Sequence, residues 1–474
     1  MEGRKNYLIK TVLMKTYDAI VIGSGQAGTP LAKKLAKAGK KTALIEKRFV
    51  GGTCVNDGCT PTKTLVASAR NAYMATRTDL GVEVTSFKID FPAIMARKDA
   101  IVIKSREGGQ KGLEETENLD LIFGDASFTG IKTLAVKLNA GGEEEMTADL
   151  IFIDTGAKTA IPKIEGLESI PYLTSTTILD LKELPESLII IGGNYIGLEF
   201  GQMFSRFGSK VTILEKGKTI MSREDADVSE TVTQFLTEEG ITVLSNAETS
   251  KVEKSADEKI TITIKQNDQI KQITASHLLI AVGRSPQTKT LNLNKTGVEI
   301  DEKGYIKVND KLETTAEGIY ALGDVKPGPA FTHIAYNDHL IVLKNLLENA
   351  NLSIKGRPVP YCMFTDPQLG RIGLSENEAR KQGLDIKVAK ITMDHVARAN
   401  EMNETKGFMK AVVDAKTDQV LGATVLGYEG GEVMAVLQMA MQGKIAAHTL
   451  RENIFAHPTM SESINNLFMS IEEA

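Results

Sequence analysis

Residues 17–46 read YDAIVIGSGQAGTPLAKKLAKAGKKTALIE. Residues 17–22 are an apolar run that indicates a buried strand, residues 30–38 have a helical pattern, and residues 41–45 indicate a second strand. The turn before the helix carries three glycines at GxGxxG spacing, Gly23, Gly25 and Gly28. Such glycines permit a tight turn and bring the N–H groups of a helix N-terminus close to a pyrophosphate. Glu46 ends the second strand and can accept from ribose hydroxyls, so the stretch predicts a dinucleotide site.

The same unit recurs later in the chain, which argues against a tight turn formed without a ligand. A strand, a helix and a second strand are expected at 188–191, 198–207 and 211–214. The second turn begins at Gly192 and closes at Gly197, and Glu215 follows the last strand. The first glycine and the acid are 23 residues apart in each unit (46 − 23 and 215 − 192). Asn194 replaces the middle glycine; because asparagine tolerates positive φ, we expect the turn to survive with a looser approach to pyrophosphate.

The acid of the second unit bears on the choice of nicotinamide cofactor. Glu215 favours the free 2′-hydroxyl of NADH and repels the 2′-phosphate of NADPH. Three basic residues follow it and could instead hold that phosphate or form a solvated turn: Lys216, Lys218 and Arg223. The sequence therefore favours NADH modestly and leaves NADPH open.

Composition limits the functional class. The chain has 474 residues and a net charge of −5, which gives no general attraction to nucleic acid or anionic membrane. Residues 1–14 look like an extension before the first strand, with Met14 as an alternative start. Three cysteines in so long a chain argue against a secreted disulfide framework and favour a cytoplasmic protein.

Two of these cysteines, Cys54 and Cys59, lie in GGTCVNDGCTPTK, residues 51–63. A zinc or iron–sulfur site needs more ligands, and Cys362 is distant in sequence. In an ideal helix, residues five apart rise about 7.5 Å, whereas a disulfide needs Cα atoms about 4.4–6.8 Å apart. A bridge therefore requires a distorted turn, which Asp57-Gly58 permits.

A short strained loop makes a reducible bridge, as redox catalysis requires. If a helix opens at Thr53–Cys54, its dipole should also lower the pKa of a cysteine and favour the thiolate. Two inert buried thiols remain the alternative.

At this point GGTCVNDGCTPTK resembles the redox-active segment of the flavoprotein disulfide reductases, the family of dihydrolipoamide dehydrogenase, glutathione reductase and mercuric reductase. The likeness extends over residues 15–468. It includes both glycine turns, TGA at 155–157, GRSP at 283–286, ALGD at 321–324 and HPTMSE at 457–462.

The resemblance implies an α/β fold with two doubly wound, Rossmann-like nucleotide-binding domains and a homodimer. The FAD domain is split around the NAD(P)H domain, and an α/β dimerisation domain follows. The expected parts are 1–14 for the extension, 15–157 and 279–345 for the FAD domain, 158–278 for the NAD(P)H domain, and 346–474 for dimerisation.

The resemblance also implies roles for single residues. NAD(P)H would reduce the flavin, which would reduce a Cys54–Cys59 disulfide; Cys59 resembles the charge-transfer thiolate and Cys54 the interchange thiol. Lys63 resembles the lysine at flavin N5, with Glu199 as its acidic partner. Tyr195 resembles the aromatic gate over the nicotinamide pocket. His457 and Glu462 resemble a general acid–base dyad that is contributed to the partner subunit.

Further cofactor contacts are implied at positions that match the family's motifs. Asp324 should meet the flavin ribitol. The other expected contacts are Gly52, Thr53, Thr155, Gly156, Gly283, Arg284 and Gly323.

The acceptor is not fixed by the motifs. FTDPQLGRIG and HVARANEMNETKGF look closest to mercuric-reductase-like proteins and to flavoproteins linked to reactive-chlorine and copper stress. The tail SINNLFMSIEEA lacks the C-terminal cysteine pair of mercuric reductases, so efficient Hg(II) turnover is not expected. We therefore expect a disulfide or thiol-reactive substrate, metal ions included, with dihydrolipoamide dehydrogenase as an alternative. A flavoprotein redox sensor of low turnover is an alternative of another class.

Overall fold

The computed structural model describes residues 14–255 and 257–471. The expected N-terminal extension, except for Met14, therefore lies outside the described residues. The chain divides into two compact units. The first comprises Met1–Thr60, Ala100–Lys158 and Arg284–Arg357, and the second comprises Pro61–Asp99, Thr159–Gly283 and Pro358–Ala474. Within the described ranges, no helix has the length and apolar character that a membrane crossing needs.

The first unit contains a mainly parallel sheet in the order β3-β2-β1-β5-β16. Its long strands β3 and β5 also pair with β4 as an antiparallel meander. The strands are β1 (Lys15–Ile22), β2 (Thr42–Glu46), β3 (Leu119–Phe128), β4 (Thr133–Leu138), β5 (Glu143–Ile153) and β16 (Ile319–Ala321). This sheet has the doubly wound order that the first glycine turn predicts.

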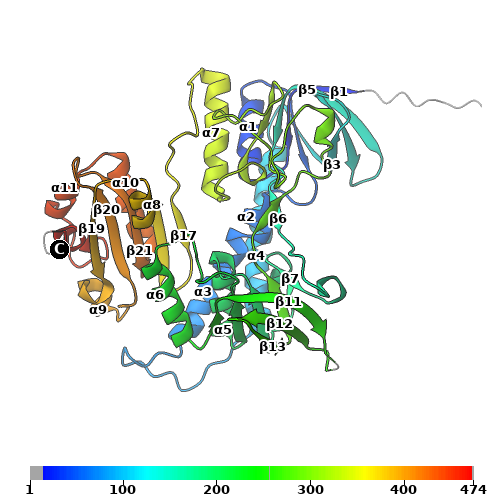
Figure 1. Cartoon of the computed structure of the whole chain (residues 1–474). Helices are drawn as coiled ribbons and strands as arrows, with labels where there is room; N and C mark the ends of the chain where they lie inside the picture. The colour runs from blue at the N-terminus through cyan, green and yellow to red at the C-terminus, as the bar shows by residue number, and fades with distance from the viewer. Residues whose placement is uncertain (1–13, 256, 472–474) are drawn as a thin grey trace, which may run out of the picture. The chain divides into compact units, whose positions relative to one another are not determined.

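Both faces of this sheet are buried, which explains the unbroken apolar run at the start of the chain. Ile20 and Ile151 belong to one apolar cluster, and Val21 and Phe152 belong to the other. Helix α1 (Gly28–Lys37) contributes Leu31, Ala32, Leu35 and Ala36 to the second cluster. It contacts α7 (Thr332–Glu348), and the two helices lie side by side in Figure 1.

The second unit contains a parallel sheet in the order β10-β9-β8-β14-β7, the second doubly wound element expected from the sequence. Its strands are β7 (Leu173–Thr174), β8 (Ser187–Ile191), β9 (Lys210–Leu214), β10 (Thr242–Leu244) and β14 (His277–Ile280). An antiparallel meander consists of β11 (Ala247–Lys254), β12 (Ile260–Gln266) and β13 (Gln269–Ala275). The helices of this part are α5 (Tyr195–Phe207) and α6 (Ala226–Glu238).

The C-terminal part of the second unit is an antiparallel sheet in the order β17-β18-β21-β20-β19, with helices packed on it (Figure 1). The strands are β17 (Tyr361–Met363), β18 (Gln368–Gly373), β19 (Ile386–Thr392), β20 (Phe408–Asp414) and β21 (Val420–Gly427). The helices are α8 (Glu376–Lys381), α9 (Ala397–Glu401), α10 (Gly430–Gln442), α11 (Ala447–Glu452) and α12 (Ser463–Met469). Its apolar core includes Met409, Leu437 and Leu467.

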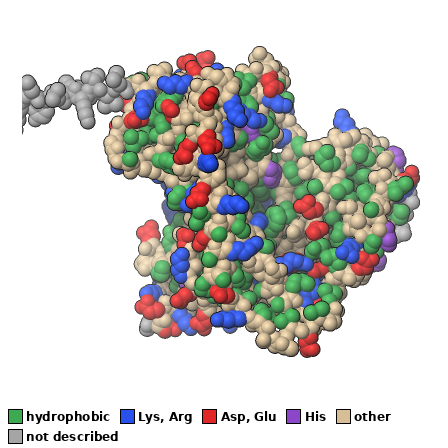
Figure 2. Space-filling view, turned by 180° about the vertical axis from the view of Figure 1, so that it is seen from behind, with side chains coloured by type: hydrophobic (Ala, Val, Ile, Leu, Met, Phe, Trp, Pro, Cys, Tyr) green, Lys and Arg blue, Asp and Glu red, His purple; other side chains and the backbone are tan. Residues whose placement is uncertain are grey.

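The remaining helices are α2 (Gly52–Asp57), α3 (Cys59–Met74) and α4 (Phe91–Glu114), and the division between the units falls within α3 and α4. Short β6 (Ala157–Thr159) pairs with β15 (Arg284–Pro286). Figure 2 shows acidic and basic side chains interspersed on the visible faces rather than gathered by sign.

Candidate active site

The first glycine turn leaves no space for side chains. Gly23 has φ +104°, and a Cβ there would lie 2.3 Å from the carbonyl oxygen of Asp154. A Cβ at Gly28 would lie 2.1 Å from the carbonyl oxygen of Gly23. Gly52 closes over the turn, since its Cβ would lie 2.7 Å from the Cα of Gly25. The turn is therefore a backbone cradle at the start of α1, the shape that a dinucleotide pyrophosphate requires.

The second glycine turn repeats this geometry. Gly192 has φ +119°, and a Cβ at Gly197 would lie 2.1 Å from the carbonyl oxygen of Gly192. The expectation for Asn194 was wrong in its mechanism, because this residue has φ −113° and does not use the left-handed region. Its side-chain oxygen instead accepts the N–H of Tyr195 at 2.9 Å and caps α5. The middle position of the turn thus has ordinary backbone geometry.

The two strand-ending acids hold the same two backbone positions in each unit. Glu46 accepts from the N–H groups of Ser24 at 3.0 Å and Arg48 at 2.7 Å. Glu215 accepts from the N–H groups of Gly193 at 2.8 Å and Gly217 at 2.6 Å. In each unit, one donor is the residue directly after the first glycine of the turn, and the other is the second residue after the acid. The sequence repeat is therefore a structural repeat down to single hydrogen bonds.

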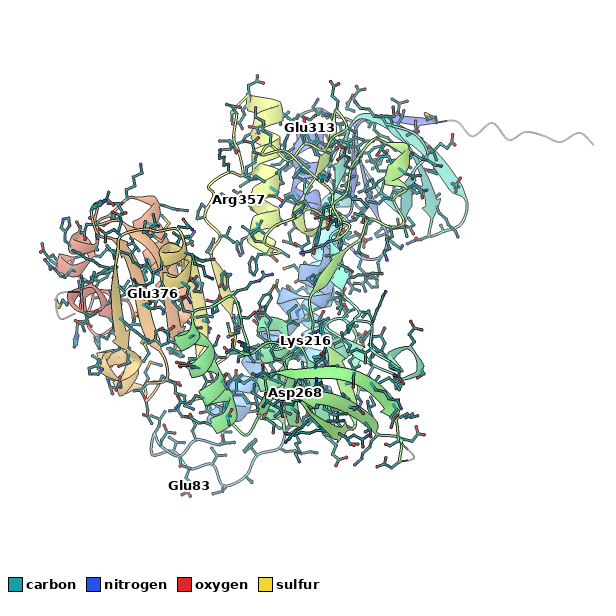
Figure 3. The ribbon with its side chains drawn as sticks, viewed as in Figure 1. Glu83, Lys216, Asp268, Glu313, Arg357 and Glu376 are labelled. Atoms are coloured by element: carbon teal, nitrogen blue, oxygen red, sulfur yellow. The ribbon has the colours of Figure 1, made fainter. Side chains whose placement is uncertain are left out.

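The basic residues after Glu215 were the reason to keep NADPH open. Lys216, labelled in Figure 3, lies 2.6 Å from Glu248. Its ammonium group is thus paired with an acid on β11.

Several expected FAD contacts lie together in the first unit. The Thr155 hydroxyl donates to the carbonyl of Gln287 at 2.9 Å, and Gly156 has φ +67°. Arg284 donates to the carbonyl of Ala157, and its Nε lies 3.9 Å from Asp324. Burial raises the pKa of Asp324 above its ordinary value, against the opposing charge of Arg284. The last expected contact, Gly283, falls in the second unit with φ +133°.

The cysteine pair lies where α2 ends and α3 begins. The break is at Gly58, where a Cβ would lie 2.9 Å from the carbonyl oxygen of Thr53. Cys54 is half-buried and Cys59 is exposed, and their thiols are hydrogen-bonded to each other. The hydroxyl of Thr332, at the start of α7, lies 3.2 Å from the Cys59 sulfur. The distorted turn that the sequence required is thus present.

The environment of Cys54 does not favour its thiolate. The helix does open at Gly52, but the pKa of Cys54 is raised, by the hydrogen bond to Cys59 and then by burial. A hydrogen bond from Thr332 opposes this rise. Two adjacent thiols titrate as a pair, because the first to ionise keeps the proton of the second in place.

Lys63 and Glu199 form the pair that the resemblance implied. The Lys63 ammonium lies 2.6 Å from the Glu199 carboxylate, whose side chain is 5% exposed. The second oxygen of Glu199 accepts the N–H of Phe364 at 2.8 Å, and Lys63 lies 4.7 Å from the Phe364 ring centroid. The lysine is therefore held in one place from two sides.

His457 and Glu462 also lie together. The Nδ1 atom of His457 is 2.9 Å from both oxygens of Glu462, so Nδ1–H donates and Nε2 is left for another proton acceptor or donor. The imidazole is exposed on this chain. A carboxylate that fixes one ring nitrogen while the other faces outward is the arrangement that a proton-transfer group needs.

Comparison with protein families gives two matches that together span most of the chain. The pyridine nucleotide-disulphide oxidoreductase model matches residues 17–338, and the dimerisation domain of the same family matches residues 359–468. The chain belongs to the pyridine nucleotide-disulphide oxidoreductase family. The resemblance inferred from the sequence and the α/β fold with two nucleotide-binding units are thereby confirmed.

Three relatives show the breadth of this oxidoreductase family. The probable pyridine nucleotide-disulfide oxidoreductase RclA of Escherichia coli is 39% identical over 463 residues, 97% of this chain and all of that protein. A mercuric reductase of Staphylococcus aureus is 36% identical, over 94% of this chain and 81% of that protein. A dihydrolipoyl dehydrogenase of Chlamydia muridarum is 33% identical, over 94% and 95%.

A solved structure of RclA matches the fold of this oxidoreductase closely. The structure is described as the Cu(II) complex of the HOCl-induced flavoprotein disulfide reductase RclA from Escherichia coli. It matches with a TM-score of 0.88 and 39% identity, covering 96% of this chain and 99% of the other.

The sequence alone missed three contacts in this pyridine nucleotide-disulphide oxidoreductase. Thr332 reaches the cysteine pair from a helix 273 positions later in the chain. Asp338 accepts the N–H of Gly323 at 2.9 Å. Asp154 accepts the N–H of Gly28 at 2.7 Å. The only sequence signal for Asp154 was its place after an apolar strand, where doubly wound sheets bind ligands.

Proposed function

We propose that this chain is an FAD- and NAD(P)H-dependent reductase that passes electrons through Cys54 and Cys59 to a thiol-reactive acceptor. We further propose that this acceptor is a thiophilic metal ion, with Cu(II) ahead of Hg(II). The observation that carries the first part is the hydrogen-bonded thiol pair at the break between α2 and α3. The second part is supported by the full-length match to RclA, a protein solved as a Cu(II) complex.

FAD, when bound, supplies two-electron transfer between the nicotinamide and the thiols. The first glycine turn and its acid Glu46 would hold it, and the second turn with Glu215 would hold the nicotinamide dinucleotide. The family supports FAD and a pyridine nucleotide. Glu215 and the Lys216–Glu248 pair support NADH over NADPH.

The residues around the thiols divide the remaining work. Thr332 donates a hydrogen bond to whichever sulfur is ionised, which stabilises the thiolate. Glu199 holds the ammonium of Lys63 in a fixed position in the second unit. His457, oriented by Glu462, accepts and returns the proton of the thiol that reacts.

The dyad supports a homodimer. His457 and Glu462 lie within the matched dimerisation domain, residues 359–468. The imidazole is exposed on this chain, as a group that serves a second copy would be. We therefore propose that each chain gives its dyad to the cysteine pair of the partner subunit.

A metal ion would meet the cysteine pair directly. Across residues 14–255 and 257–471 there is no group of three or more His, Cys, Asp or Glu side chains that could hold a metal ion. The third cysteine, Cys362, is half-buried in β17, and burial raises the pKa of its thiol to about 12. Its thiol therefore keeps its proton at neutral pH and makes a poor relay ligand.

The test is the oxidation of NADH and of NADPH by the purified holoenzyme with three acceptors side by side: Cu(II), Hg(II) in excess thiol, and lipoamide. One NADH should reduce two Cu(II) to two Cu(I) and leave NAD⁺ and one proton. Turnover with Cu(II) that disappears in Cys54→Ser supports the proposal. Cu(II) turnover that survives this substitution overturns the route through the cysteines.

Two other outcomes identify the alternatives. Fast lipoamide turnover with little response to either metal would make the chain a dihydrolipoyl dehydrogenase, a function carried by relatives 33% identical to it. Reduction of the bound cofactor without turnover of any acceptor would favour a redox sensor.

A further inference from the structure

Asp154 lies at the junction of the elements that form the first glycine turn. It follows β5 directly, and its Oδ2 accepts the N–H of Gly28 at 2.7 Å. A Cβ at Gly25 would lie 2.7 Å from Oδ2, and a Cβ at Gly323 would lie 2.7 Å from Oδ1. The residue is 7% exposed. The carboxyl group is thus packed under the cradle, between the turn and the segment that carries Asp324.

The second unit shows that the turn itself does not need this acid. A Cβ at Gly23 would meet the carbonyl oxygen of Asp154 at 2.3 Å, and a Cβ at Gly192 would meet that of Ala281 at 2.4 Å. The N–H of Asp154 donates to the carbonyl oxygen of Ile22, and the N–H of Ala281 donates to that of Ile191, each at 2.8 Å. Ala281 is therefore the counterpart of Asp154, and it supports the same turn with a methyl group. Asp154 must serve something that differs between the two sites.

The charges around Asp154 are mostly of its own sign. The negative charges of Asp324, of Asp338 on α7 and of Glu46 at the end of β2 all raise the pKa of Asp154. The nearby cations are bound to these neighbours: Arg284 lies near Asp324, while Lys326 and Arg357 (labelled in Figure 3) pair with Asp338. Among the residues that the structure describes, no cation forms an ion pair with Asp154.

Burial raises the pKa of Asp154 most, and the acidic neighbours raise it further, whereas the hydrogen bond from Gly28 lowers it. Together they hold the pKa of Asp154 well above its ordinary value. Burial among like charges, with no cation of the described residues paired to it, therefore disfavours the ionised form of the Asp154 carboxyl group. Because Oδ2 accepts the N–H of Gly28, Oδ1 is the oxygen that carries the proton in the neutral form.

We propose that Asp154 is a cofactor-binding residue whose neutral carboxyl group donates a hydrogen bond to a pyrophosphate oxygen of the dinucleotide held by the first glycine turn. This inference rests on the proposed placement of FAD in that turn. An ionised Asp154 would put a negative charge against the pyrophosphate, whereas the neutral acid adds a donor to the backbone N–H groups. The corresponding alanine leaves the second site without this donor, which fits a tightly held cofactor in one unit and an exchanging one in the other.

The test measures FAD binding to the apoprotein by flavin fluorescence for four proteins at pH 6: wild type, Asp154→Asn, Asp154→Ala and Asp149→Ala. The asparagine amide keeps a neutral donor, and the alanine reproduces the second unit. Asp149 is a matched control, an exposed carboxylate on β5, the strand that Asp154 follows. We expect wild type, Asp154→Asn and Asp149→Ala to bind alike and Asp154→Ala to bind about tenfold to a hundredfold more weakly, as loss of a hydrogen bond to a charged group implies. Equal or tighter binding by Asp154→Ala would overturn the proposal.

A second measurement is independent of FAD binding and of how well the alanine variant folds. The infrared difference between wild type and Asp154→Asn at pH 7 should contain the C=O stretch of a protonated carboxylic acid. A carboxylate band in its place would refute the neutral state. If instead the wild-type apoprotein binds no FAD, the placement of the cofactor fails, and that result is separate from either outcome for Asp154.

Discussion

Replacing Thr332 with valine removes one hydroxyl beside the cysteine pair and keeps the shape of the side chain. The hydroxyl lies 3.2 Å from the Cys59 sulfur and also bonds to Cys54, whose pKa it lowers. A hydrogen bond to a charged group contributes about 1.5–3 kcal/mol, and one pKa unit corresponds to about 1.4 kcal/mol. Thr332→Val should therefore raise the apparent pKa of the first thiol to ionise by about one to two units.

The assay is the rate of alkylation by iodoacetamide as a function of pH on the reduced protein, because only the thiolate reacts. Thr332→Ser is the matched control, since serine keeps the hydroxyl and should leave the profile in place. The mass of the alkylated peptide distinguishes Cys54 from Cys59. A valine variant with an unshifted profile would refute the claim that Thr332 stabilises the thiolate.

Three further predictions concern the second unit. His457→Ala should slow acceptor turnover by about a hundredfold, as expected for loss of a general acid–base group. The rate at which NADH reduces the bound flavin, measured by stopped flow, should not change. Equal loss of both rates would make His457 structural. Lys410→Met should lower the free energy of urea unfolding by about 3–5 kcal/mol at pH 7, because a buried Asp225 loses its 2.7 Å partner. Burial raises the pKa of Asp225, but the hydrogen bond from Lys410 and its other partners lower it overall, so this contribution is present at neutral pH. It should fade as pH falls through the acidic range; a constant difference from wild type would contradict it. Glu215→Ala should raise KM for NADH about tenfold and KM for NADPH less, measured by initial rates, and equal changes would remove Glu215 from cofactor selection.

The parts of the fold that could be predicted were those with short-range signals. The two glycine turns and their acids follow from spacing within about 25 residues, and the strand runs follow from apolar periodicity. The pairing of Lys63 with Glu199 came only from resemblance, since the two residues are far apart in sequence and no local pattern joins them. A contact of that kind depends on how the sheet orders its strands.

What could not be predicted depends on three-dimensional crowding. The left-handed backbone expected at Asn194 is absent because the residue has φ −113° and serves as the cap of α5. The sequence suggested a lowered pKa for a cysteine of the pair, but it could not show that the second thiol and burial raise the pKa of Cys54. Thr332 and Asp154 were not identified because their roles arise from elements brought together by the sheet.

The paired hydrogen bonds of Glu46 and Glu215 have a consequence for the speed of nucleotide capture. Each acid fixes the N–H after the first glycine and the N–H two residues beyond itself through hydrogen bonds within the protein. The turns therefore need little ordering when a dinucleotide arrives, and little conformational entropy is lost on binding. Association with such a preformed turn is limited by encounter and orientation rather than by folding of the loop. Variation in affinity among substitutions at these turns should accordingly appear in the dissociation rate.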